Sequence, residues 1–426
     1  MKDKSFDEQI RIMRAENYLL PGGWAAAMEA EGFEVFETAY GEIALLARWA
    51  HEHGLARLLH QPDFFFHVLR EQVKAFQPDV LFWYAGAFSL VPRDLRQKLR
   101  ASAPSISVVS GFWGDELPHG STYEESFSDV DLVFCSSLGY QKNFEAAGIR
   151  ALSIGNCFEP SITFEVPRKK TRDFIFCGTS GYGYADHIGR YEKLVELMSK
   201  SKLEMWANEP NPGDQRNPVR DFLINGASRL PRNLLANIQE YGFGRMKSLA
   251  RLGMLVQDTE LDAASLLSPA ITHPQRRYFD NLKPLGDLFA SRVKKQLPNA
   301  SDYYQLLAES RLVLNLHRDE EVDVGNIRCF EVTGIGSCLI TDHGNGMKEF
   351  FDIENDIVTF NSVDECLAKV RYLLDHPAEI DRIAKNGQRT TLARHTVAHR
   401  CQAIAATLRN SRLAEGSRKR SLVVST

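Results

Sequence analysis

Short, continuous apolar runs alternate with amphipathic segments of helical length along the first part of the chain. Apolar runs bounded by turn residues are typical of strands buried on both faces. Helices between such strands predict a parallel sheet that is covered on both sides. We therefore expect a Rossmann-like α/β unit. Its expected strands are residues 33–36, 80–84, 106–110, 131–135 and 150–154.

Residues 160–170 interrupt this pattern with two prolines and a basic run, which predicts an interdomain linker. A second α/β series follows the linker. The two series predict an N-terminal domain over residues 1–165 and a C-terminal domain over residues 166–395. The expected strands of the second domain are residues 173–178, 202–206, 311–316, 337–341 and 356–360.

The alternation lapses from residue 208 to about residue 285, which predicts a helical insertion of unknown role in the second domain. Further helix is expected over residues 279–295. The last part of the chain, residues 396–426, is expected to hold a terminal helix and a tail that frays over residues 412–426. The helices expected near the C-terminus are residues 363–374, 377–394 and 396–409.

The composition is that of an ordinary globular protein of 426 residues, with 44% hydrophobic and 25% charged residues. It excludes a disordered chain, a collagen-like repeat and a small disulfide scaffold. The net charge of −4 provides no overall positive field that would attract nucleic acid or an anionic membrane. Local basic patches and peripheral membrane contact stay open.

The seven cysteines are scattered without a CxxC pair, which indicates buried, reduced thiols and no zinc framework. The N-terminus lacks the apolar core of a signal peptide, and no apolar stretch is long enough to span a bilayer. We therefore predict a soluble, cytoplasmic protein.

The richest chemistry lies in residues 313–351, where a predicted strand leads through an acidic loop into a helix that begins near Asn326. Free N–H groups at a helix start form an anion site. Arg328 and Glu331 are three residues apart and share one face of this helix. A guanidinium suits phosphate oxygens, and a carboxylate suits the two hydroxyls of a ribose. An ordinary helix ion pair is the alternative.

Three further features point to the same predicted edge. The loop after the strand at residues 173–178 contains Gly178 and Thr179, and Arg190 follows in the next helix. Such a loop suits a diphosphate, although an ordinary turn is equally open. After the strand at residues 337–341, His343 and Asn345 lie in a glycine-rich loop that could approach a phosphate.

In the first domain, Trp113 and Asp115 follow the strand at residues 106–110. Trp113 could stack on an acceptor ring, and Asp115 could hold sugar hydroxyls or stabilise an oxocarbenium charge. The alternatives are a core tryptophan and a helix-capping aspartate. His395 and His399 are four residues apart but lack the glutamate of a zinc motif, so no metal site is predicted.

The ordered run N-x-R-x-F-E-x-x-x-x-G-x-x-L-I-T-D, followed by K-E-F-F and H-T-x-x-x-R, resembles the CgeB-like glycosyltransferases, relatives of the group 1 glycosyltransferases. The resemblance covers roughly residues 312–408. The matching residues are Asn326, Arg328, Phe330, Glu331, Gly336, Thr341, Asp342, Glu349, Phe350, His395, Thr396 and Arg400.

The resemblance implies the GT-B fold, in which two Rossmann-like domains face a central cleft and the last helix crosses back to the first domain. It implies a nucleotide-diphosphate sugar on the second domain and an acceptor on the first, with retention of configuration. Relatives use an acid-x7-Glu pair, which here would be Asp323 and Glu331, with aspartate in place of the usual glutamate. Arg190 would help neutralise the leaving diphosphate without a metal, and Asp115 lies where relatives place a group near the reacting sugar.

No cofactor is implied beyond the donor substrate, and the acceptor could be a glycan, a protein or a small molecule. Two alternatives stay open, a nucleotide-sugar 2-epimerase and a non-catalytic protein that binds a glycan or a partner. A dinucleotide-dependent oxidoreductase is disfavoured because the G-x-G-x-x-G fingerprint is absent.

Overall fold

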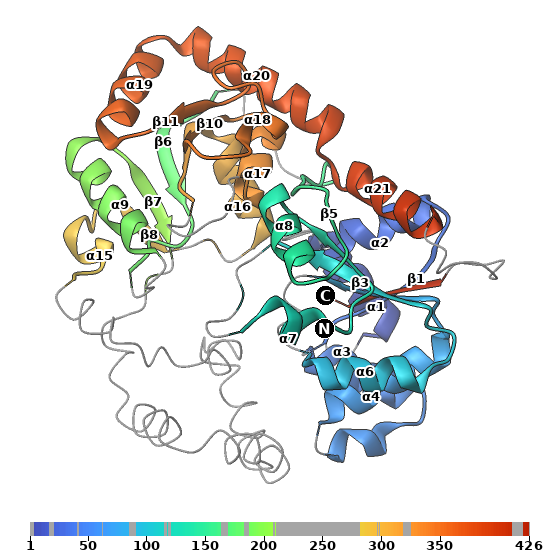
Figure 1. Ribbon diagram of the computed structural model, residues 1–426. Helices are drawn as coiled ribbons and strands as arrows, with labels where there is room; N and C mark the ends of the chain where they lie inside the picture. Colours follow the sequence, from blue (N-terminus) through green and yellow to red (C-terminus); the bar gives the residue numbers. More distant parts are fainter. Residues whose placement is uncertain are drawn as a thin grey trace.

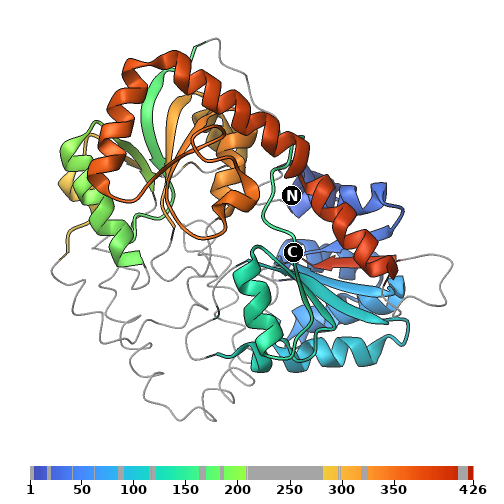
Figure 2. The same ribbon diagram turned by 45° about the horizontal axis from the view of Figure 1, so that its top comes forward.

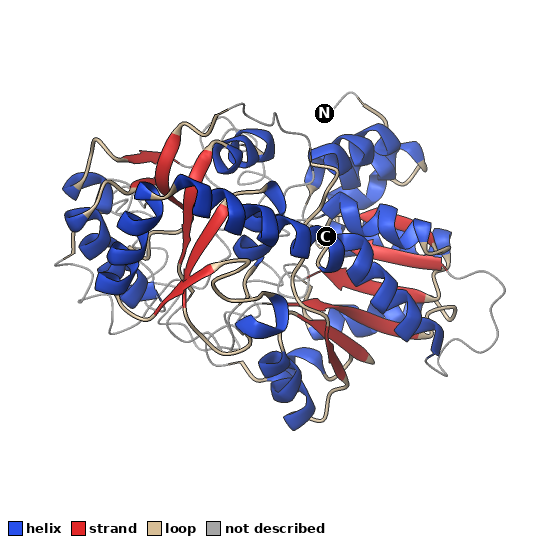
Figure 3. Ribbon diagram, turned by 90° about the horizontal axis from the view of Figure 1, so that it is seen from above, coloured by secondary structure: helices blue, strands red, loops and turns tan. Residues whose placement is uncertain are grey.

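The computed structural model describes residues 4–16, 21–40, 42–61, 63–84, 91–114, 117, 121–162, 169–182, 187–207, 209, 282–295, 297, 299–317, 325–410 and 421–425. These residues form two α/β domains, each built on a six-stranded parallel sheet (Figures 1 and 3). The predicted pair of Rossmann-like domains is confirmed. A search of the described helices for a membrane span finds none of sufficient length and hydrophobicity.

The N-domain sheet has the spatial order β1-β12-β2-β3-β4-β5. Its strands are β1 (Glu34–Thr38), β2 (Val80–Tyr84), β3 (Val108–Trp113), β4 (Leu132–Cys135), β5 (Ala151–Ser153) and β12 (Ser421–Ser425). The surrounding helices are α1 (Phe6–Glu16), α2 (Pro21–Ala30), α3 (Ile43–Glu52), the short η1 (Ala56–His60), α4 (Phe64–Phe76), α6 (Arg93–Ser102), α7 (Tyr123–Phe127) and α8 (Leu138–Ala146).

Successive residues of the N-domain strands point to opposite faces, and both faces are buried. Leu81 and Val109 pack on one face with residues of α4, α6 and α8. Phe82 packs on the other face, against Trp24 of α2 and Ile404 of the C-terminal helix α21 (Val397–Asn410). The continuous apolar character of the predicted strands therefore has a direct physical cause.

Strand β12 corrects the expected fraying of the tail for residues 421–425. It lies between β1 and β2 and is parallel to both. Leu422 and Val423 are each 1% exposed and belong to the cores on opposite faces of the sheet. The Ser421 N–H and hydroxyl donate to Asp79 Oδ2 at 2.9 and 3.1 Å. The short apolar run fills a gap between two strands, which outweighs the usual disorder of a chain end.

The C-domain sheet has the order β11-β10-β9-β6-β7-β8. Its strands are β6 (Arg172–Cys177), β7 (Glu204–Ala207), β8 (Val293–Lys295), β9 (Ser310–Asn315), β10 (Cys338–Asp342) and β11 (Val358–Phe360). The helices are α9 (Ile188–Lys200), α15 (Leu285–Leu288), α16 (Ala300–Ala308), α17 (Ile327–Ile335), α18 (Met347–Phe350), α19 (Val363–Asp375) and α20 (Pro377–Arg394).

The expected helix over residues 279–295 is wrong at its end, because residues 293–295 form β8 and pair with β7. Pairing with a strand edge outweighs the helical pattern of so short a segment. Most of the expected insertion, residues 208–285, lies outside the described residues.

Two stretches of chain join the domains side by side, and we call them the double crossing (residues 155–158 and 395–400). The Phe158 N–H donates to the His395 carbonyl at 2.8 Å, and the Val397 N–H donates to the Phe158 carbonyl at 3.0 Å. Helix α21 begins within the second stretch of the double crossing, follows α20 in the chain and packs on α2 of the N-domain (Figure 2).

Candidate active site

The candidate site lies where the order of the C-domain strands reverses. The chain runs outward from β6 through β7 to β8, and then returns to the other side of β6 to form β9, β10 and β11. Loops diverge at the carboxyl ends of the strands at such a switch point, and ligands of α/β sheets bind there. Gly178 follows β6 at this edge, His317 follows β9, and Asp342 ends β10.

Helix α17 begins at this edge, as predicted. Its N-cap is Asn326, whose side chain makes no capping hydrogen bond. Instead, Asn326 Nδ2 donates to Asn315 Oδ1 at 3.2 Å. The side chain therefore leaves the first N–H groups of the helix for another acceptor, which is the arrangement of an anion site.

Glu331 and Arg328 lie together, as predicted, with Arg328 Nη1 3.4 Å from Glu331 Oε2. Two tyrosines of α16 that the sequence did not indicate complete the group. Tyr303 Oη donates to Glu331 Oε2 at 2.7 Å, and Tyr304 Oη donates to Oε1 at 2.9 Å. The Arg328 guanidinium lies over the Tyr303 ring, 4.7 Å from its centre.

The carboxylate of Glu331 is more enclosed than a ribose-binding role suggests, since the residue is only 2% exposed. Burial raises its pKa, while Arg328 and the Tyr304 hydroxyl act in the opposite direction. Each carboxylate oxygen has a second lone-pair site beyond its tyrosine bond. Burial chiefly raises the pKa of Tyr84 at the end of β2, and the charge of Glu331 adds to this shift.

Arg328 also reaches the predicted glycine loop. A Cβ added to Gly178 would lie 3.8 Å from Arg328 Nη2, so the guanidinium stands beside the end of β6. Arg328 Nη1 is buried and makes no hydrogen bond within the described part of the chain. The side chain as a whole remains 20% exposed. Nη1 is held by the charge of Glu331, and the exposed part of the guanidinium is the part that a ligand can reach.

Arg190 forms hydrogen bonds to the loop after β6 and to the loop after β9. Its Nη2 donates to the Leu316 carbonyl at 2.8 Å, and its Nη1 donates to the Thr179 carbonyl at 3.5 Å. The residue is buried. These bonds fix the relative positions of the loops after β6 and β9, and contact between Arg190 and a diphosphate stays a prediction.

The remaining predicted residues fall into three groups. His343 and Asn345 are exposed in the loop after β10, at the same sheet edge. Asp115 and Asp323 lie outside the described residues. Trp113 is buried in the N-domain core, with its ring edge-on to Phe127 at 5.1 Å between centres. Its predicted stacking on an acceptor is therefore corrected, because core packing covers the ring.

The double crossing is bonded to the site through Phe350 of α18. His395 Nε2 bonds the Phe350 carbonyl at 3.0 Å, and Arg400 Nη2 donates to His395 Nδ1 at 2.8 Å. Arg400 also donates to the carbonyls of Gly155 and Asn156. Burial, followed by the Arg400 charge, lowers the pKa of His395 to about 4. A neutral imidazole therefore joins the two domains.

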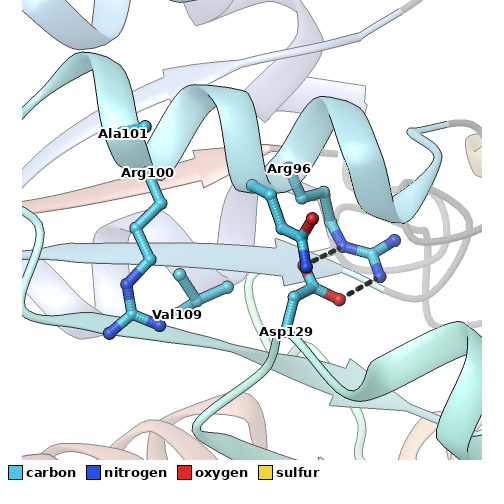
Figure 4. A pocket seen from close by; sticks show the side chains of 6 residues that line it. Arg96, Arg100, Ala101, Val109 and Asp129 are labelled. Carbon is cyan, nitrogen blue, oxygen red and sulfur yellow. Dashed lines mark hydrogen bonds and ion pairs between the residues drawn. The ribbon is translucent and has the colours of Figure 1, made fainter.

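The histidine pair offers no metal site in this arrangement, because His399 Nδ1 pairs with Thr396 Oγ1 at 2.7 Å while His395 bonds elsewhere. Searching the described ranges for three neighbouring metal-ligating side chains finds none. A cavity of about 400 Å³ lies beside α6 at the opposite, amino-terminal edge of the N-domain sheet (Figure 4). It is bordered by the buried Arg96–Asp129 ion pair at 2.7 Å and is separate from the candidate site.

Comparison with solved structures defines the class of fold. Sucrose-phosphate synthase from Thermosynechococcus elongatus matches with a TM-score of 0.51 at 11% identity, covering 91% of each chain. HepE from Anabaena in complex with UDP-glucose matches with a TM-score of 0.51 at 14% identity, covering 89% of this chain and 99% of that one. HepE in complex with UDP matches with a TM-score of 0.50 at 16% identity, covering 82% of this chain and 84% of that one. The chain has the GT-B fold.

Residues 266–406 also match the family described as "Glycosyl transferase-like". This range contains α17 and the whole Arg328–Glu331 group. The match and the fold together support a relation to the group 1 glycosyltransferases. No curated protein matches the chain in sequence.

Proposed function

We propose that the protein is a glycosyltransferase that moves a sugar from a nucleotide-diphosphate sugar to an acceptor. The family match over residues 266–406 supports the reaction class, and the HepE structures hold UDP and UDP-glucose in a protein of the same fold. The CgeB-like group and retention of configuration belong to this proposal through the sequence resemblance, and a cytoplasmic location belongs to it through the scattered, unpaired cysteines.

The donor diphosphate would lie between the start of α17 and the loop after β6. Arg328 would supply N–H groups from the exposed part of its guanidinium, and the helix start would add further N–H groups. Glu331 would accept the ribose hydroxyls on the lone pairs that the tyrosines leave open. Fixed donors of this kind stabilise the charge of the leaving diphosphate, so the reaction would need no metal ion.

The acceptor would bind on the N-domain side, where Asp115 is proposed to hold or stabilise the reacting sugar. Asp323 is proposed to face the donor sugar. His343 and Asn345 would approach the phosphates from the loop after β10, where both side chains are exposed. A glycan, a protein or a small molecule could serve as acceptor.

The observation that carries the proposal is the partly exposed Arg328 guanidinium, paired with Glu331 and lying beside Gly178, at the edge where α/β sheets bind ligands. It is tested by thermal unfolding of the wild type and of Arg328→Lys with UDP, GDP, ADP and CMP. We expect one nucleotide to raise the wild-type Tm and to do so far less in the variant. Arg311→Lys is the matched control, since Arg311 forms a partly exposed ion pair with Asp173.

Stabilisation by no nucleotide would contradict the proposal and favour a non-catalytic binding protein. Incubation of the corresponding nucleotide sugar then separates the enzyme classes. A transferase releases nucleotide in step with glycosylation of an acceptor, whereas an epimerised nucleotide sugar formed without acceptor would contradict transfer.

A further inference from the structure

Gly325 precedes the N-cap of α17 and has a backbone that other residues adopt only with strain. Its φ is +113°, and a Cβ at this position would lie 2.7 Å from Cε2 of Phe350. Both the conformation and the lack of space require glycine. A side chain at this position would therefore displace either the peptide that leads into the donor helix or the Phe350 ring.

This residue is held from both domains. The Gly325 N–H donates to His317 Nε2 at 3.1 Å, and the Gly325 carbonyl accepts from Asn156 Nδ2 at 3.0 Å. His317 follows β9 of the C-domain, while Asn156 belongs to the double crossing. One bond thus fixes the helix start to its own sheet, and the other fixes it to the connection between the domains.

The first of these bonds determines the state of the imidazole. Because Nε2 accepts a hydrogen bond, it carries no proton, so Nδ1 carries the proton and donates it to Asp342 Oδ1 at 2.7 Å. Lys193 Nζ lies 3.3 Å from the other Asp342 oxygen. Burial would raise the pKa of Asp342, but the hydrogen bonds from His317, together with the Lys193 charge, hold it below its usual value.

His317 is itself buried, and both of its ring nitrogens are occupied. It is therefore placed to hold another group and is not available as a proton acceptor for a substrate. A carboxylate that fixes the tautomer and orientation of a histidine is a known means of aiming the opposite ring nitrogen. Here the opposite nitrogen, Nε2, accepts a hydrogen bond from the Gly325 N–H, just before α17.

We propose that His317 is a positioning residue for the glycosyl transfer, and that Asn156 is its counterpart from the double crossing. Together they hold the Gly325 peptide so that the N–H groups at the start of α17 meet the leaving diphosphate. This inference rests on the proposed function and extends it to the position of the helix start. Since the charge on the diphosphate grows as the bond to the sugar breaks, misplaced donors reduce kcat more than they reduce donor affinity.

Two variants of His317 separate the two ring nitrogens. In His317→Gln, the amide oxygen lies near the position of Nε2 and can still accept from Gly325. In His317→Asn, the shorter amide lies near the position of Nδ1 and can still donate to Asp342, but it does not reach Gly325. The two variants have the same chemical group and differ in which bond they retain.

The assay measures nucleotide release as a function of donor concentration, with unfolding curves recorded for every variant. We expect His317→Asn to lower kcat by about 10- to 100-fold with the donor KM changed by less than about threefold, because small displacements of aligned groups cost this much. His317→Gln should recover most of that loss. Asn156→Ala should lower kcat in the same way, and adding it to His317→Asn should cost less than the product of the single losses.

Equal losses in the glutamine and asparagine variants of an active, folded enzyme would overturn the inference alone. A kcat of His317→Asn equal to that of the wild type would also overturn the inference. If His317→Asn does not fold, Asn156→Ala carries the test, since its only role in the inference is the bond to Gly325. A wild-type protein that binds no nucleotide and releases none would instead overturn the proposed function, and the inference with it.

Discussion

Replacing Glu331 by glutamine tests the ribose assignment most directly. The substitution preserves the size of the side chain and removes its charge. One oxygen that accepts from Tyr303 or Tyr304 becomes an NH2 group that cannot accept. The other oxygen stays but becomes a weaker acceptor. The tyrosine hydroxyls and any ribose hydroxyls therefore compete for fewer lone pairs.

The expected loss of binding follows from the number of bonds. A hydrogen bond to a charged group contributes about 1.5–3 kcal/mol, and a neutral one about 0.5–1.5 kcal/mol. Losing one ribose bond and neutralising the second should cost about 2–3 kcal/mol, which corresponds to roughly 30- to 150-fold weaker nucleotide binding. The effect on folding must be measured separately, because the variant removes a buried charge but also leaves Arg328 without its ion-pair partner.

Calorimetric titration with the stabilising nucleoside diphosphate and with its 2′-deoxy analogue measures this loss. The wild type should bind the analogue about tenfold more weakly or worse. Glu331→Gln should discriminate little between the two ligands, because the partner of the 2′-hydroxyl has already been weakened. Unfolding curves establish that the variant is folded.

Two results would refute the reasoning. One is a folded Glu331→Gln variant that binds the nucleotide within about threefold of the wild type, which would make Glu331 a structural partner of the tyrosines only. The other is full additivity of the two losses, which would show that Glu331 and the 2′-hydroxyl do not interact.

Three further predictions concern the core and the domain connection around the site. Leu422→Ala should lower the free energy of unfolding by about 2–4 kcal/mol in denaturant titrations. Leu392→Ala removes a side chain that is 42% exposed and should change the free energy of unfolding by less than about 0.5 kcal/mol, and equal effects of the two variants would contradict the burial of β12. The pKa of His395 is about 4 in the folded state and 6.5 in the unfolded state, so between these pH values the unfolded state binds the extra proton. The free energy of unfolding should therefore fall by about 3 kcal/mol from pH 6.5 to pH 4. His395→Asn should flatten this dependence in unfolding curves recorded across that range, and an unchanged slope would contradict the neutral, buried imidazole. Trp113→Phe should lower Tm without changing acceptor KM, and a raised acceptor KM in a stable variant would restore the stacking role.

The sequence predicted the sheets better than it predicted the site, for a physical reason. A strand buried on both faces, such as β2, needs a continuous apolar run, and that run is visible in one dimension. Strand β8 has no such run, and its pairing depends on the exposed edge of β7. β12 has the apolar run, but only the folded N-domain provides the gap that it fills.

At the site, the spacing of Arg328 and Glu331 on one helix face was sufficient to predict that they lie together. The tyrosines that enclose Glu331 come from α16, and their contact depends on how two helices pack on one sheet. The core position of Trp113 has the same origin, because a tryptophan at the end of a strand can face either the packed helices or a ligand. Only the tertiary structure distinguishes these two environments.

The contacts of Gly325 show why this fold would link domain movement to chemistry. The residue that precedes the donor helix is bonded to the C-domain through His317 and to the double crossing through Asn156. The Phe350 ring touches both Gly325 and Gly155, and its carbonyl bonds His395. A rotation about the double crossing would therefore move groups in direct contact with the start of α17. In a transferase, the donor helix would then be correctly placed only when the two domains have the relative position that this bonded arrangement sets.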